Sequence, residues 1–165
     1  MLLEVIKLKK KKWLSLLLTV IMVLSLVPMT VFAAGTVTVQ IGGTTLNDGA
    51  NSIGGGTATL DKAAGTLTLE NVSVTNYIAI QSDSEFTIIA KGNNAIGSID
   101  SRTNGTAMFS TNVPTLNVQI QEGATLSLYT TNGNNIYLVA GALNISGPGK
   151  FVADTTCLLY TSRCV

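Results

Sequence analysis

The chain contains no histidine, and its two cysteines, Cys157 and Cys164, both lie in the last nine residues. Residues 1–156 therefore cannot form a serine–histidine or cysteine–histidine catalytic pair. Charged residues are only 12% of the chain and aromatic residues 5%. We predict that the protein is not an enzyme. A pair of carboxylates, which can hydrolyse a glycoside without histidine, is the alternative.

The first 33 residues have the order of a secretion signal. Five lysines within residues 7–12 precede an apolar run at residues 13–27, a helix break at Pro28 and a small residue, Ala33. This order predicts a signal helix that is cleaved after Ala33. A retained membrane anchor is the alternative, but polar residues interrupt the run before it reaches the ~18 apolar residues of a spanning helix. Both interpretations place the remainder outside the cytoplasm, secreted or at the cell surface, and after cleavage no membrane association is expected.

The last nine residues, 157–165, continue no upstream pattern and resemble a translated sequencing adapter. A native strand whose two cysteines form a disulfide is the alternative. We expect a fragment of a bacterial protein that naturally continues beyond Thr156 with a different sequence.

Charge excludes one class of partner. Residues 35–156 carry four cationic and eight acidic side chains, a net charge of −4. Proteins that bind nucleic acid or anionic membranes present clustered lysine and arginine. We therefore predict no nucleic-acid partner.

Apolar residues alternate with polar ones throughout residues 35–156, which is typical of β-strands, and glycine and asparagine clusters separate the runs. One pattern also repeats: Phe86, Leu116 and Leu143 occupy like positions 30 and 27 residues apart. Periods of this size are typical of stacked repeat proteins. The asparagines are interpreted as turn residues rather than ligand contacts.

Equivalent residues of successive repeats can stack on one another. This favours an all-β fold, a right-handed parallel β-helix (β-solenoid) after the signal helix, and an antiparallel β-sandwich is the alternative. The expected organisation is a signal peptide at residues 1–33, N-terminal capping strands at 34–60, β-helix repeats at 61–156 and the adapter-like tail at 157–165.

Three segments carry a resemblance to a known group of proteins. They are an opening strand that ends in Gly42-Gly43, the strand Gly65-Thr66-Leu67-Thr68-Leu69, and a later strand followed by Gly92-Asn93-Asn94. Over residues 36–96 the chain resembles secreted carbohydrate-binding domain-containing proteins of anaerobic gut-type bacteria. The resemblance implies a parallel β-helix and a polysaccharide ligand, since distant members are said to bind cellulose or pectic polymers with calcium.

Sugar binding usually needs an exposed aromatic ring surrounded by hydrogen-bonding groups. Alternation predicts that Tyr77 and Tyr137 point outward, because their neighbours Ile78, Ile136 and Leu138 are expected to point inward. Tyr129 is the third candidate, and the phenylalanines, Phe109 among them, are expected in the core. A role for the tyrosines in covering strand edges is the alternative.

For a cofactor, calcium is the one candidate. Asp83 and Glu85 place two carboxylates in one turn, but calcium takes six to eight oxygen ligands, so the pair is only part of a site. The predicted function is a non-catalytic, secreted or cell-surface module whose partner is a polysaccharide or a host or cell-wall glycan. A structural adhesin stalk that presents another domain is the alternative.

Overall fold

The computed structural model describes residues 36–131 and 133–156. The predicted signal at residues 1–33 and the adapter-like tail at 157–165 lie outside this part of the chain. Within it, sixteen strands and no helix form, which confirms the all-β prediction. The described residues accordingly include no helix that is long and apolar enough to cross a membrane.

Sheet A contains five strands in the order β14-β11-β7-β1-β2. The parallel strands are β7, β11 and β14, and β1 pairs antiparallel with both β7 and β2. Their bounds are β1 Thr38–Ile41, β2 Thr44–Thr45, β7 Ile78–Gln81, β11 Met108–Thr111 and β14 Ile136–Leu138. In the parallel part, Met108 lies opposite both Ile78 and Ile136, so like positions of the sequence repeat are neighbours.

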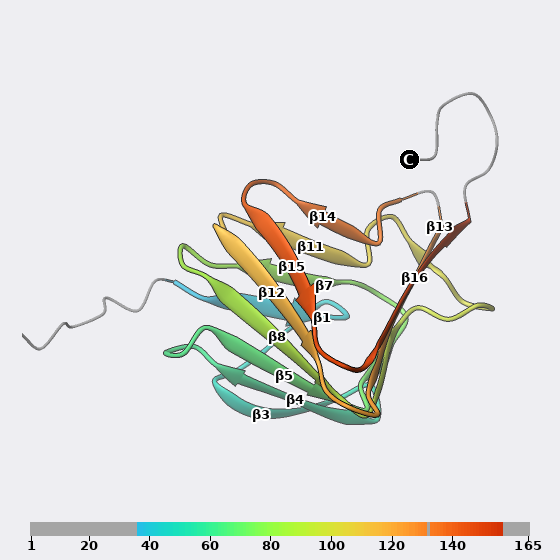
Figure 1. Cartoon of the computed structure of the whole chain (residues 1–165), viewed down its shortest axis with the longest axis horizontal. Coiled ribbons are helices and arrows are strands. Elements are labelled where there is room, and N and C mark those ends of the chain that lie inside the picture. The colour runs from blue at the N-terminus through green and yellow to red at the C-terminus, as the bar shows by residue number, and fades with distance from the viewer. Residues whose placement is uncertain (1–35, 132, 157–165) are drawn as a thin grey trace, which may run out of the picture. The chain divides into compact units, whose positions relative to one another are not determined.

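Sheet B contains six strands in the order β15-β12-β8-β5-β4-β3 and lies at the front of Figure 1. Within this sheet β3, β4 and β5 pair antiparallel with one another, and β5, β8, β12 and β15 pair parallel. Their bounds are β3 Gly49–Ile53, β4 Gly56–Asp61, β5 Thr66–Glu70, β8 Phe86–Lys91, β12 Thr115–Ile120 and β15 Ala142–Ser146. Leu116 lies opposite both Phe86 and Leu143.

Sheet C has the order β10-β13-β9-β6, and β16 also pairs with β13. Every pairing in it is parallel. The bounds are β6 Ser73–Val74, β9 Asn93–Ile96, β10 Thr103–Asn104, β13 Thr125–Thr131 and β16 Lys150–Thr156.

The prediction of a right-handed parallel β-helix is wrong. The strands form three separate sheets, two of which are mixed, and β1 to β5 pair antiparallel wherever they pair with one another. Two glycine pairs explain the β1–β2 and β3–β4 reversals: Gly42 and Gly43 have φ of 60° and 84°, and Gly54 and Gly55 have φ of 58° and 76°. Two successive residues at positive φ make the tight turn of a two-residue hairpin. The alternative, an antiparallel sandwich, does not fit the parallel ladders either.

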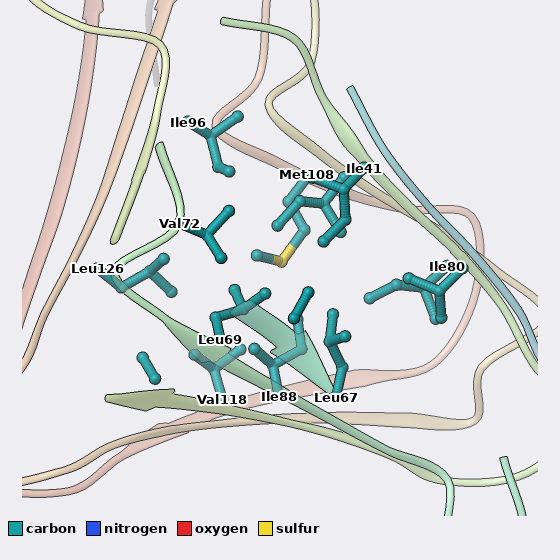
Figure 2. Packing of buried hydrophobic residues seen from close by; sticks show 14 of the residues in the cluster. Ile41, Leu67, Leu69, Val72, Ile80, Ile88, Ile96, Met108, Val118 and Leu126 are labelled. Atoms are coloured by element: carbon teal, nitrogen blue, oxygen red, sulfur yellow. The ribbon is translucent and has the colours of Figure 1, made fainter. Parts of the chain in front are cut away.

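The inner faces of the three sheets share one hydrophobic core. Figure 2 shows Ile41, Ile80 and Met108 from sheet A meeting residues of sheet B (Leu67, Leu69, Ile88 and Val118) and of sheet C (Ile96 and Leu126). The same alternation that buries these side chains directs the intervening ones to the outer faces. Burial of each large aliphatic side chain contributes about 1.5–3 kcal/mol, so this core fixes which side chains face outward.

Asparagine side chains hold the corner between sheets B and C. Asn94 is 2% exposed; its Oδ1 accepts a hydrogen bond from the Val72 N–H at 2.9 Å, and its Nδ2 donates to the Lys91 carbonyl at 2.9 Å. Asn71 has φ of 56°, and its Oδ1 accepts from the Asn93 N–H at 3.0 Å. Both asparagine side chains form hydrogen bonds with backbone groups, which agrees with the interpretation of the asparagines as turn residues.

Candidate functional site

Two aromatic rings stack on the outer face of sheet A. Phe109 on β11 lies opposite Tyr137 on β14, and their ring centroids are 5.8 Å apart with an interplanar angle of 6°. Tyr137 is 44% exposed, and Phe109 is half-buried. Parallel pairing of the two strands produces the stack, because it places residues of equal register side by side on one face.

The expectation that Phe109 belongs to the core is wrong. Alternation along β11 buries Met108 and Ser110 and leaves Phe109 and Thr111 half-buried. A signal was present in the sequence, since Met108 and Ile136 occupy like positions of the repeat and Phe109 therefore matches Tyr137. Phe86, by contrast, is fully buried, and Phe151 packs partly buried against the core.

Tyr77 lies beside the central strand of the same sheet, two strands away from β14. It directly precedes β7, is 38% exposed, and its carbonyl accepts a hydrogen bond from the Gly42 N–H at 2.9 Å. Alternation places Tyr77 on the same face as Ala79, which lies opposite Phe109. Two strand spacings and two residues of rise separate the Cα atoms of Tyr77 and Tyr137 by about 12 Å.

A shallow pocket of about 280 Å³ adjoins Tyr77. It is lined by the end of β1, the start of β2, the end of β3, strand β6 and the two residues that follow β6. Aliphatic residues and hydroxyl or amide residues both line it: Ile41, Gly42, Thr44, Ile53, Ser73, Val74, Thr75 and Asn76. Gly42 lines this pocket and donates its backbone N–H to the Tyr77 carbonyl, and Asn76, the residue before Tyr77, also lines it. Small-molecule sites typically combine such an apolar wall with a few polar groups.

Tyr129 lies on a different sheet from the other two tyrosines. It is on β13 of sheet C, and the Arg102 guanidinium lies 5.8 Å from its ring centroid. Arg102 Nη2 also pairs with Asp154 Oδ2 at 3.0 Å, and Asp154 lies opposite Tyr129 in the ladder. By alternation Tyr77 and Tyr137 share the outer face of sheet A, whereas the structure places Tyr129 in an ion-pair cluster on sheet C.

Asp83 and Glu85, the predicted metal ligands, lie in the turn between β7 and β8, and both are exposed. Asp83 Oδ2 accepts a hydrogen bond from Thr36 Oγ1 at 3.3 Å, and the Ser82 hydroxyl organises the turn through hydrogen bonds with the Ser84 backbone. Within residues 36–131 and 133–156 no group of three or more histidine, cysteine, aspartate or glutamate side chains could hold a metal ion. The turn thus supplies two carboxylates and no third.

Comparison with known proteins identified no relative: no protein-family model, curated protein or solved structure matches this chain.

Proposed function

We propose that this protein is a non-catalytic carbohydrate-binding module, acting outside the cell, that holds a polysaccharide against the outer face of sheet A. The observation that carries the proposal is the placement of Tyr77 and the Phe109–Tyr137 stack on one sheet face, with a polar-lined pocket beside Tyr77. A flat ring covers the apolar face of a sugar, and the hydroxyl and amide residues beside it satisfy the sugar hydroxyls.

The arrangement supports binding to an extended chain rather than to one isolated sugar. The Cα atoms of Tyr77 and Tyr137 are about 12 Å apart by strand geometry, so the two tyrosines can contact different sugars of one chain. A polymer that lies across β7, β11 and β14 reaches both tyrosines, and each further contact then raises the affinity through effective concentration.

The proposal is tested by retention of the full chain on insoluble cellulose, pectin and mucin. Tyr77→Ala and Tyr137→Ala should each weaken retention about tenfold, which corresponds to about 1.4 kcal/mol. Tyr129→Ala is the matched control, because it removes the same side chain from sheet C. Circular dichroism verifies that each variant is folded.

Two outcomes would contradict the proposal. Absence of retention on all three materials by a folded chain would favour the stalk alternative. Equal losses in the variants of Tyr77, Tyr137 and Tyr129 would show that sheet A is not the binding face.

A further inference from the structure

We infer that the polysaccharide bound by sheet A is electrically neutral, an inference that rests on the proposed carbohydrate-binding function. The five strands β1, β2, β7, β11 and β14 contain no aspartate, glutamate, lysine or arginine. The residues that line the pocket beside Tyr77 are uncharged as well. The face that carries the exposed tyrosines thus offers no formal charge to a ligand.

The cationic side chains of the described residues all lie elsewhere. Lys62 is in the turn between β4 and β5, Lys91 ends β8 of sheet B, and Lys150 begins β16 of sheet C. Arg102 is held by Asp154 and lies over Tyr129. No cation in this part of the chain therefore belongs to a strand of sheet A or to the pocket.

The nearest charges along β7 are negative. Asp83 and Glu85 follow the end of this strand in an exposed turn. A polymer of uronic acids or a sialylated glycan carries carboxylates that are normally recognised by charge-assisted hydrogen bonds from arginine or lysine. Here such a polymer would be repelled by the two carboxylates at the end of β7 and would find no compensating cation. A neutral glycan needs no cation for its recognition.

The outer face instead supplies neutral donors and acceptors. Gln40 lies opposite Ala79 in the column that continues through Phe109 to Tyr137. Gln81 and Thr111 form a parallel column beside it. Amide and hydroxyl groups both donate and accept hydrogen bonds, which matches the hydroxyls of an unmodified sugar.

Affinity electrophoresis of the full chain tests the inference. The gels contain a neutral polymer, either hydroxyethyl cellulose or galactomannan, or the anionic polymer polygalacturonate, with and without calcium. We expect at least a tenfold stronger retardation by a neutral polymer than by polygalacturonate. Because no formal charges are paired, we also expect little change in retardation between low and high salt.

A gain-of-charge variant sharpens the test. Gln40→Lys places a cation in the aromatic column and should create salt-sensitive retardation by polygalacturonate. Gln119→Lys, on the outer face of sheet B, is the matched control and should not create such retardation.

The outcomes separate this inference from the proposed function. Retardation by polygalacturonate equal to or stronger than that by the neutral polymers overturns neutrality and leaves carbohydrate binding intact. If that retardation requires calcium and is lost in Asp83→Asn, the carboxylate turn is the site instead. Absence of retardation in every gel, with native circular dichroism, overturns the proposed function and the inference together.

Discussion

The two ends of the hydrophobic core differ, although apolar and polar residues alternate in the strands of both ends. At the N-terminal end, β1, β4 and the loop residue Leu46 close the core, and Ile41, Leu46 and Leu60 are at most 2% exposed. At the other end Leu143 is only partly buried, and Ile145 and Val139 are 43% and 53% exposed. Leu116 and Val118 lie directly opposite Leu143 and Ile145, yet both are fully buried. The neighbouring strand, and not the pattern itself, therefore decides burial.

The largest expected effect on stability comes from replacing one of two paired leucines with alanine. Leu116→Ala should lower the free energy of unfolding by about 3–5 kcal/mol, because it leaves a cavity between Phe86 and Leu143. Leu143→Ala, in the same column, should cost about 1 kcal/mol. Urea denaturation followed by circular dichroism measures both, and similar losses would show that residues beyond β15 cover this end in solution.

A smaller effect is expected from the polar corner. Asn94→Ala should cost about 2–3 kcal/mol, since it leaves the Val72 N–H and the Lys91 carbonyl without their partner in a buried position. Asn144→Ala is the counterpart at the open end, where the side chain is exposed and donates to Asn117 Oδ1 at 3.0 Å. It should change stability by less than about 0.5 kcal/mol. A small loss in Asn94→Ala would contradict the assigned corner role.

The smallest effect should be a gain. Ser110 lies in sheet A opposite Ile80 and Leu138, and its buried Oγ has no hydrogen-bond partner within residues 36–131 and 133–156. Ser110→Ala should raise the midpoint of thermal unfolding and add about 1 kcal/mol, because an unsatisfied hydroxyl is removed from the core. Ser127→Ala, in sheet C, is the control and should give no gain. A loss of stability in Ser110→Ala would indicate a partner for the hydroxyl.

Much of the local structure could be predicted from the sequence. Alternation indicated the strands and the all-β class, and the spacing of Phe86, Leu116 and Leu143 coincides with the observed register between β8, β12 and β15. The global arrangement could not be predicted in the same way, because a repeat indicates which residues are neighbours but not how the first strands reverse. The hairpin signals Gly42-Gly43 and Gly54-Gly55 were visible, and they determine the β1–β2 and β3–β4 hairpins.

The candidate site was predicted less completely. The outward direction of Tyr137 follows from alternation, and its exposure agrees with that expectation. The stack with Phe109 was missed because the phenylalanines were assigned to the core by residue type rather than by position in the strand. The pocket beside Tyr77 joins residues from β1, β2 and β3 with β6 and the segment before β7, and such a long-range combination depends on the hairpin topology.

The Phe109–Tyr137 stack also reports on strand register. A shift of β14 by one residue against β11 would turn Tyr137 to the inner face and separate the rings. The two rings therefore stack only when β14 is in register with β11. Near-ultraviolet circular dichroism or a nuclear Overhauser contact between them would follow the docking of β14 during folding, separately from the formation of the remaining sheets.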